Sequence, residues 1–302
     1  MRFWYNKKAN MPVKVGFLVS YDYEYLKFSI PQIYEDSDEI YLAIDRDFYT
    51  WSGSRYLIDP DFFQWLKEFD KLNKITIYRE KFYLDGYTPL ELETRERNML
   101  GKYMGEGGWH LQIDSDEYFS DFKAFIVKLR NLEKRYSKTK LTITARLITI
   151  FKITAGGFLL VQNSEGIFNV ATNYPIYKLA RAQNCEKIVN SNVYVLHQNF
   201  SRSEDELQYK MKNWGHKNDF NVDSYFKLWK LIDEYNYKYV MNFHPLGRGS
   251  DWPSLILVPV KSIEELILGI KNGYIKTTSI DIKLKDFFPP VFVKILKYYF
   301  HL

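Results

Sequence analysis

The sequence has a single cysteine, Cys185, among 302 residues. One thiol cannot close a disulfide within the chain or supply a cysteine-rich zinc site, so both are excluded. The sequence also has no stretch of 18 apolar residues, and the apolar run 15–19 after the basic N-terminal segment is too short for the core of a secretion signal. We therefore expect a cytoplasmic protein that neither spans a membrane nor leaves the cell by a standard signal.

A large excess of charge of one sign is absent as well. Lys and Arg number 42 against 37 Asp and Glu, a net charge of +5, and the basic residues are spread along the chain rather than gathered in one block. A protein dedicated to nucleic acid is therefore disfavoured, and we expect no nucleic-acid partner. With 15 Gly, 10 Pro and 46% hydrophobic residues, the composition is that of a globular protein and excludes a collagen-like or disordered chain.

Aromatic residues are abundant, with 7 Trp, 25 Tyr and 22 Phe. Such rings either fill a core or stack on sugars and bases, and core filling is the simpler interpretation. Trp214 illustrates the choice, because it has helical spacing with Leu207 and Met211, which favours a core contact, while an exposed ring followed by His216 would suit an acceptor sugar.

Strand and helix patterns alternate in the first half of the chain. Short β-branched and apolar runs predict strands at residues 13–21, 39–45, 74–78 and 109–113, and the periodicity between them predicts helices at 26–34, 60–69 and 88–104. Asp59-Pro60 and Thr88-Pro89 are start signals for the second and third helices. Strands separated by helices of this length predict an α/β fold with a mainly parallel sheet covered on both faces.

The second half has a different pattern. A helix is predicted at 122–136, strands at 140–153, 158–162 and 193–196, and polar helices at 204–214 and 224–235. We predict a catalytic domain over residues 1–200 and a mostly helical C-terminal extension over 201–302. The aromatic tail 287–302, which includes two lysines, either docks on the protein's own core or makes a peripheral contact with the inner face of a membrane.

Acidic residues gather where the predicted parallel strands end, which is the edge at which such sheets bind ligands. Four Asp-x-Asp pairs occur in the sequence, so the spacing alone says little. The pairs at 36/38 and 59/61 fall at a turn and a helix start, where structural roles are expected. Asp114-Ser115-Asp116 directly follows a buried strand, so its two carboxylates could hold a divalent cation while leaving positions for diphosphate oxygens and water.

At this point the order of features resembles that of family 2 type glycosyltransferases with the A-type nucleotide-sugar fold. The segment 19–26 reads VSYDYEYL and stands where that family has a strand-end Tyr-Asn-Glu cluster, with Asp45 at its second-strand acid. The segment 94–119 reads TRERNMLGKYMGEGGWHLQIDSDEYF and is similar to its Arg-Asn helix, glycine break, apolar strand and Asp-x-Asp. The segment 195–220, VLHQNFSRSEDELQYKMKNWGHKNDF, resembles one of bacterial sugar-transferring relatives in which a strand-end His completes the metal site.

The resemblance implies a role for each matching residue. Tyr21 and Asp45 would hold the base and ribose of a nucleoside diphosphate sugar, Arg97 would offset phosphate charge, and Asp114 would bridge ribose and metal, with Ser115 in the same donor-binding set. The metal ligands for Mn²⁺ or Mg²⁺ would be Asp114, Asp116 and His197. From the residues alone, Arg97 has another reading, as one member of an i, i+4 charge pair with Glu93.

The catalytic base is not assigned by any motif. Transfer with inversion needs a carboxylate or a similar group to accept the proton of the acceptor hydroxyl. Glu165 and Glu186 are the candidates by chain region, although each is more simply a surface charge. Whether the configuration is inverted or retained stays open.

The resemblance implies a hexosyltransferase that moves a sugar from a nucleoside diphosphate sugar, UDP favoured, to a saccharide or lipid-linked acceptor in bacterial surface polysaccharide assembly. Two other classes fit the same acidic edge. A non-catalytic carbohydrate-binding or scaffold protein would show no donor turnover, and a nucleotidyltransferase would release pyrophosphate instead of a nucleoside diphosphate.

Overall fold

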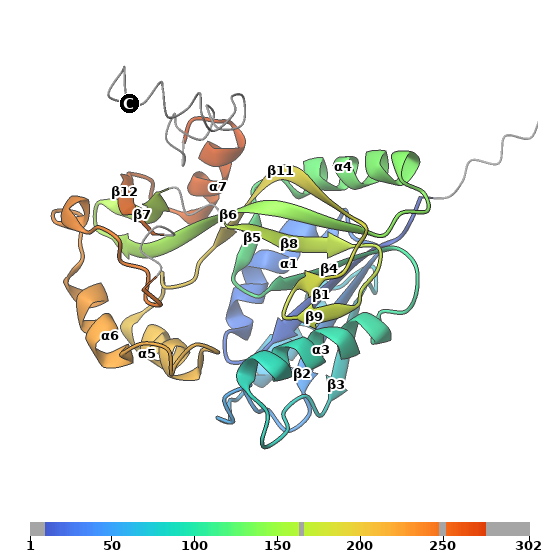
Figure 1. Ribbon diagram of the computed structural model, residues 1–302, viewed down its shortest axis with the longest axis horizontal. Helices are drawn as coiled ribbons and strands as arrows, with labels where there is room; N and C mark the ends of the chain where they lie inside the picture. The colour runs from blue at the N-terminus through green and yellow to red at the C-terminus, as the bar shows by residue number, and fades with distance from the viewer. Residues whose placement is uncertain (1–9, 163–165, 248–251, 276–302) are drawn as a thin grey trace, which may run out of the picture. The chain divides into compact units, whose positions relative to one another are not determined.

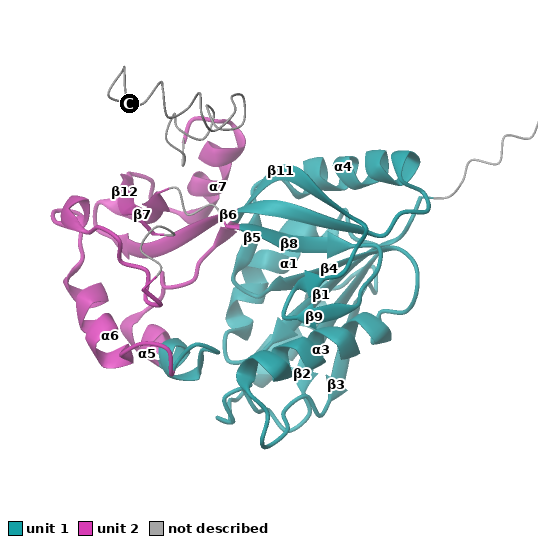
Figure 2. Cartoon of the chain, viewed as in Figure 1, with its two compact units in different colours: residues 1–146, 167–195, 209–217 teal, residues 147–166, 196–208, 218–302 magenta. Residues whose placement is uncertain are grey.

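The computed structural model describes residues 10–162, 166–247 and 252–275 (Figure 1). The chain forms two compact units, coloured separately in Figure 2. Unit 1 contains residues 1–146, 167–195 and 209–217, and unit 2 contains residues 147–166, 196–208 and 218–302. The predicted division into residues 1–200 and 201–302 stays a prediction, because these units alternate along the chain and do not follow a single cut.

The centre of unit 1 is a parallel sheet. Its parallel strands, in the spatial order β4-β1-β2-β3, are β1 (Val13–Val19), β2 (Glu39–Asp45), β3 (Ile75–Glu80) and β4 (Trp109–Asp114). Val15 is aligned with Ile40 on one side and with Leu111 on the other, and all seven residues of β1 are buried. The predicted α/β fold with a mainly parallel central sheet is therefore confirmed.

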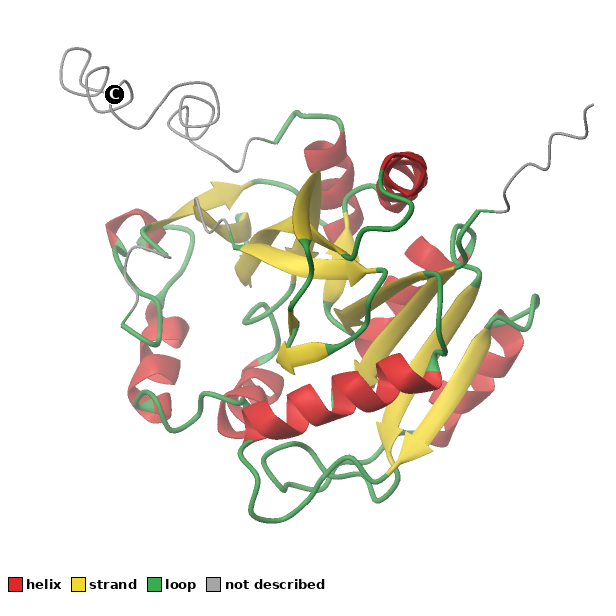
Figure 3. Cartoon of the chain, turned by 45° about the vertical axis from the view of Figure 1, so that its right-hand side comes forward, coloured by secondary structure: helices red, strands yellow, loops and turns green. Residues whose placement is uncertain are grey.

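Each of the four parallel strands is followed in the chain by a helix (Figure 3, red). These helices are α1 (Leu26–Tyr34), α2 (Pro60–Phe69), α3 (Pro89–Tyr103) and α4 (Phe122–Arg135). The start signals act as expected: the Asp59 side chain accepts a hydrogen bond from the Asp61 amide, and Thr88 and Glu91 form a reciprocal capping box.

Helices α2 and α3 cover opposite faces of the sheet. Neighbouring residues of a strand point to opposite faces of its sheet. On one face, Tyr78 of β3 stacks on Tyr103 of α3. On the other, the guanidinium of Arg79 lies 5.2 Å from the ring centroid of Phe48 and 5.3 Å from that of Phe63, which belongs to α2. The sheet is thus buried between helical layers, which leaves its strand ends as the place for polar side chains.

Antiparallel strands extend the sheet of unit 1 beyond β4. Strand β8 (Ile167–Thr172) pairs with β4 and with the first part of β6 (Leu141–Thr154), while β5 (Glu117–Phe119) pairs with β11 (Lys187–His197). A short hairpin is formed by β9 (Tyr177–Leu179) and β10 (Ala182–Gln183). Strands β5, β8, β9 and β10 are absent from the sequence-based prediction.

Unit 2 combines a small antiparallel sheet with helices. Strand β7 (Gly157–Gln162) pairs with the second part of β6 and with β12 (Ser254–Val258). The helices are α5 (Glu204–Asn213), whose last residues belong to unit 1, α6 (Val222–Leu231), the 3-10 turn η2 (Tyr237–Tyr239) and α7 (Ile263–Lys271). The core is aromatic, as expected, with ring contacts joining Phe151, Phe200, Phe243 and Trp252.

Among the described residues, no helix is long and apolar enough to cross a membrane. The aromatic tail 287–302, for which a core or membrane contact was expected, lies outside the described residues.

Candidate functional site

The candidate site lies at the edge of unit 1 where the four parallel strands end. Because β1, β2, β3 and β4 run in the same direction, their C-terminal residues meet at one edge. Tyr21 follows β1, Asp45 ends β2, and the acidic turn 114–116 begins at the end of β4. The sheet therefore places the residues that the resemblance singled out at one edge, and their role in binding a donor stays a prediction.

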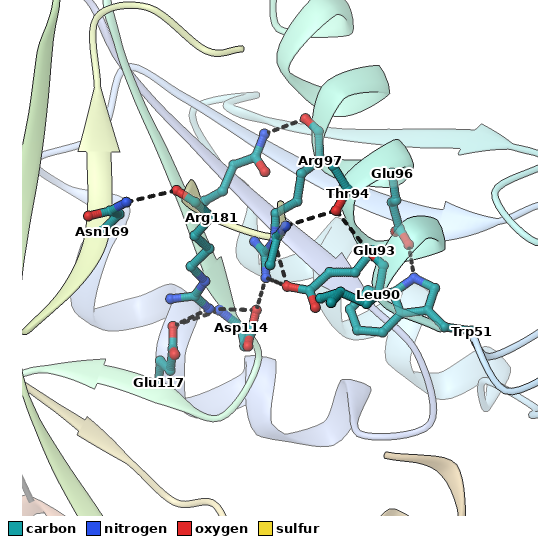
Figure 4. A network of polar contacts seen from close by, with 12 residues as sticks. Trp51, Leu90, Glu93, Thr94, Glu96, Arg97, Asp114, Glu117, Asn169 and Arg181 are labelled. Carbon is teal, nitrogen blue, oxygen red and sulfur yellow. Dashed lines mark hydrogen bonds and ion pairs between the residues drawn. The ribbon is translucent and has the colours of Figure 1, made fainter. Parts of the chain in front are cut away.

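Asp114 is bound by two arginines from different elements (Figure 4). Its Oδ1 accepts a hydrogen bond from Nη2 of Arg97, on α3, at 3.0 Å, and lies 2.7 Å from Nη2 of Arg181, in the β9–β10 turn. The Arg97 side chain is only 1% exposed, whereas that of Asp114 is 37% exposed. Asp114 is thus the solvent-facing member of a buried cationic cluster.

Two glutamates complete this network (Figure 4). Glu93 accepts from Arg97 Nε at 2.9 Å, and Glu117 accepts from Arg181 Nη2 at 2.8 Å and from the Asp114 amide at 2.9 Å. Burial opposes the charge of each guanidinium, but the surrounding carboxylates outweigh it and raise the pKa of Arg97 and of Arg181. The i, i+4 pair of Arg97 with Glu93 is therefore present, and the binding of phosphate by Arg97 stays a prediction.

Three buried polar atoms of this cluster have no hydrogen-bond partner among the described residues. They are Nη1 of Arg97, Nη1 of Arg181 and Oγ of Ser115. A buried donor without a partner is costly, so such atoms mark places where a further group is expected. The two Nη1 atoms can only donate, so a partner for them must offer acceptor oxygens, as a phosphate does.

Asp116 is also bound by a basic side chain. It is 2% exposed, and its Oδ2 lies 2.9 Å from Nζ of Lys210, which sits in the last turn of α5 and is itself about 10% exposed. Lys210 was not singled out from the sequence, because a lysine in a polar helix looks like an ordinary surface residue.

The acidic turn does not fit a divalent cation in this arrangement. Oδ1 of Asp114 and Oδ2 of Asp116 each face basic nitrogens at 3.0 Å or less, and no group of three or more His, Cys, Asp or Glu within residues 10–162, 166–247 and 252–275 is arranged to hold a metal ion. His197, the third expected ligand, is the last residue of β11 and belongs to unit 2. Metal binding by Asp114, Asp116 and His197 stays a prediction.

Asp45 holds two loops together. Its Oδ1 accepts from the Asp47 and Tyr49 amides at 3.0 and 3.1 Å, and its Oδ2 accepts from the Phe82 and Tyr83 amides at 2.8 and 3.0 Å. These four bonds occupy the carboxylate, which is 3% exposed as a residue. Its contact with ribose or base stays a prediction, and its observed contacts are those of a residue that shapes the edge.

Tyr21 is half-buried next to α5. Its ring meets that of Tyr209 edge-on, with the centroids 4.9 Å apart. The Tyr209 hydroxyl donates to the Arg55 carbonyl at 3.1 Å, and the Ser52 hydroxyl donates to the Asn213 carbonyl at 2.8 Å. The end of α5 therefore fastens the loop after β2 beside Tyr21, the proposed contact of the base.

Glu96 is a buried carboxyl that sequence analysis missed. It accepts a hydrogen bond from the Trp51 indole at 2.7 Å and is 5% exposed (Figure 4). Burial raises its pKa to about 8. Two neighbouring residues of α3 thus reach different partners. Arg97 contacts the acidic turn, and Glu96 contacts Trp51 in the loop after β2.

The two candidate bases are not placed in this cluster. Glu165 lies outside the described residues, and Glu186 is an exposed residue directly before β11. Both stay predictions, and the catalytic base remains unassigned.

No protein-family model matches the chain, and no curated protein matches it. Among solved structures, it is similar to the mannosyltransferase PcManGT from Pyrobaculum calidifontis in complex with GDP-Man and Mn²⁺, at 12% identity over 46% of this chain and 37% of that chain, with a TM-score of 0.34. It is also similar to GalNAc-T7 with UDP, GalNAc and Mn²⁺, at 9% identity over 97% of this chain and 58% of that chain, with a TM-score of 0.38.

A third similar structure is the mannose-1-phosphate geranyltransferase from Thermus thermophilus, at 8% identity over 80% of this chain and 68% of that chain, with a TM-score of 0.26. The chain thus spans only 37% and 58% of the length of the first two structures. Likeness at these TM-scores does not establish a shared family.

Proposed function

We propose that this protein is a glycosyltransferase that moves a sugar from a nucleoside diphosphate sugar to an acceptor hydroxyl. The observation that carries the proposal is the 3.0 Å contact between Arg97 and Asp114. These residues come from the two segments that resemble the family's Arg-Asn helix and Asp-x-Asp turn, which are 17 positions apart in the chain. Their meeting at the carboxyl end of a parallel sheet is what a donor-binding site of this kind requires.

The surroundings of this contact suit the leaving group of such a reaction. When the glycosidic bond breaks, negative charge accumulates on the diphosphate, and fixed positive groups stabilise that charge. Arg97 and Arg181 supply two buried guanidinium groups, each with an Nη1 that has no partner among the described residues. In the proposal they bind the phosphates, while Tyr21 contacts the base and Asp45 keeps the neighbouring loops in place.

The substrates are proposed with the resemblance as their basis. UDP is the favoured donor nucleotide, and the acceptor is a saccharide or a lipid-linked saccharide. The resemblance also implies Mn²⁺ or Mg²⁺ as cofactor; because the acidic turn as described pairs with basic side chains, the test of the proposal is made with and without the metal.

The proposal is tested by calorimetric titration of UDP and GDP into the wild-type protein, with Mn²⁺ and with EDTA. We expect one nucleotide to bind and Arg97→Lys to weaken that binding by about tenfold, because lysine keeps the charge but loses the bidentate fork. Arg135→Lys, at an exposed position that ends α4, is the matched control and should bind as the wild type does.

Product analysis separates the alternatives. Incubation with UDP-sugars and GDP-sugars should release the nucleoside diphosphate, whereas pyrophosphate formed from nucleoside triphosphate and sugar phosphate would identify a nucleotidyltransferase. If neither nucleotide binds under either condition, the glycosyltransferase proposal fails and a carbohydrate-binding protein becomes the better interpretation.

A further inference from the structure

Two arginine donors beside the acidic turn have unused hydrogen-bonding capacity. Nη1 of Arg97 and Nη1 of Arg181 are buried and have no partner among the described residues, and the Ser115 hydroxyl between the two aspartates is in the same state. The Arg97 side chain is 1% exposed, so its Nη1 is shielded from bulk solvent. A ligand that satisfies the two Nη1 atoms must carry acceptor oxygens, and a metal ion carries none.

The carboxylate oxygens that a cation would need are already close to positive charge. Asp114 Oδ1 lies between the Nη2 atoms of Arg97 and Arg181, at 3.0 and 2.7 Å, and Asp116 Oδ2 lies 2.9 Å from Lys210 Nζ. A divalent ion placed on these oxygens would repel three cationic groups at short range, two of them on the buried residues Arg97 and Lys210.

The Lys210 ammonium occupies the position beside Asp116 Oδ2 that a bound cation would need. This ammonium is compact, carries positive charge and lies within hydrogen-bond distance of the 2%-exposed carboxylate. The lysine is held on a helix whose next turn is fastened to the loop after β2, since Asn213 accepts from Ser52 through its carbonyl and from Thr50 through Oδ1. Lys210 therefore has a defined position and is not a mobile surface charge.

We propose that Arg97, Arg181 and Lys210 bind the diphosphate of the donor directly, with the Lys210 ammonium in the place of the divalent cation that the resemblance implies. The inference rests on the proposed function, because it takes the ligand to be a nucleoside diphosphate. It differs from the expectation of a metal held by Asp114, Asp116 and His197, and it gives Lys210 and Arg181 roles that no motif indicated.

The test measures UDP and GDP affinity by titration calorimetry in EDTA and in Mn²⁺, for the wild type, Lys210→Ala and Lys210→Arg. We expect the nucleotide affinity of the wild type to be the same in EDTA and in Mn²⁺, within about twofold. The nucleoside without phosphates should bind much more weakly. Lys210→Ala should lose about tenfold or more in EDTA and recover part of the loss in Mn²⁺, because the vacated Asp116 can then accept the ion. Lys210→Arg should stay independent of Mn²⁺.

A matched control is Lys212→Ala, which removes an exposed lysine two positions further along the same helix and should change nothing. Thermal unfolding of each variant shows whether it is folded. If Lys210→Ala unfolds because the buried Asp116 carboxylate loses its 2.9 Å contact with the ammonium, the double variant Lys210→Met with Asp116→Asn removes both charges, and it should bind weakly with no recovery in Mn²⁺.

The outcomes distinguish this inference from the proposed function. Binding by the wild type that needs Mn²⁺, or that is at least tenfold stronger with it, would overturn the inference and leave the glycosyltransferase proposal standing. If Lys210→Ala loses the same amount of nucleotide affinity with and without Mn²⁺, the inference that Lys210 takes the place of a cation is overturned. If neither nucleotide binds in any condition, both the inference and the proposed function fail.

Discussion

Buried ionisable side chains are concentrated in one part of unit 1. Glu96, Arg97, Asp116 and Lys210 are each less than 10% exposed as residues, although ionisable residues are rarely buried to this extent. A buried ion pair gains little stability over an apolar pair of the same size, because desolvation offsets the attraction. The burial of the charged groups Arg97, Asp116 and Lys210 is thus better explained by the proposed ligand binding than by a contribution to folding.

Glu96 leads to a prediction about pH. Its pKa is raised by burial from 4.5 to about 8, so the folded protein holds a proton that the unfolded chain releases over this range. The stability that this proton provides is fully present below pH 4.5 and is lost as the pH rises towards 8. Relative to Glu96→Gln, the wild type should therefore lose on the order of 4 kcal/mol of unfolding free energy between pH 5 and pH 9.

Urea unfolding at several pH values measures this difference directly. Glu96→Gln is a suitable reference because the glutamine carbonyl can still accept from the Trp51 indole, so only the titrating proton is removed. If the difference in unfolding free energy between wild type and Glu96→Gln stays constant from pH 5 to pH 9, Glu96 is ionised throughout and is not buried in solution.

At the scale of elements, the loops that follow β2 and β3 are joined by a side chain. Asp45, at the end of β2, accepts from amides at 47 and 49 in its own loop and at 82 and 83 in the loop after β3. One carboxylate thus sets the spacing of two connections that border the candidate site. A residue with four such bonds leaves buried backbone donors without partners when it is removed.

We expect Asp45→Ala to lower the free energy of unfolding by about 3 kcal/mol or more, and Asp45→Asn by about 2 kcal/mol, because an amide offers one acceptor atom instead of two. Denaturant unfolding of both variants measures this loss. Asp47→Asn, which alters a surface pair with Arg46, should stay within about 0.5 kcal/mol of the wild type. Were Asp45 only a ligand of the nucleotide, Asp45→Asn would weaken UDP binding and leave unfolding unchanged.

The local elements of this fold could be predicted because their signals are local. Helix α1 and strand β2 have the predicted limits, and α2 and α3 begin at the Asp-Pro and Thr-Pro signals. Three of the missed strands, β5, β9 and β10, have two or three residues each, too few to show an alternating pattern, whereas the missed strand β8 has six. Their formation depends on partners that are distant in sequence, such as β11 for β5.

The candidate site could be predicted only in part for the same reason. Arg97 and Asp114 belong to one continuous stretch that carries a recognisable order of residues. Arg181 and Lys210 reach the acidic turn from 67 and 94 positions further along the chain, and neither has a motif around it. The sequence could therefore indicate the acids of the site, whereas the basic residues that bind them emerge only from the fold.

At the scale of the whole molecule, the chain passes between its two compact units five times. Residues 209–217 belong to unit 1 although they follow a segment of unit 2, and Lys210 of this short segment pairs with Asp116. Unit 1 is therefore completed only by residues that lie beyond position 200. A boundary at 200 would separate the acidic turn from one of its basic partners.

This arrangement makes a prediction about fragments. A protein cut after residue 200 would leave Asp116 buried without Lys210, the loop after β2 without Asn213, and β7 without β12. Because a buried charge that loses its partner costs about 3–5 kcal/mol, a large share of a typical domain's stability, we expect fragment 1–200 to aggregate or to unfold without a cooperative transition. Circular dichroism during heating, compared with the full chain, measures this. A fragment that unfolds cooperatively and binds UDP as the full chain does would instead support an independent domain at 1–200, and it would also count against Lys210 as a residue that binds the diphosphate.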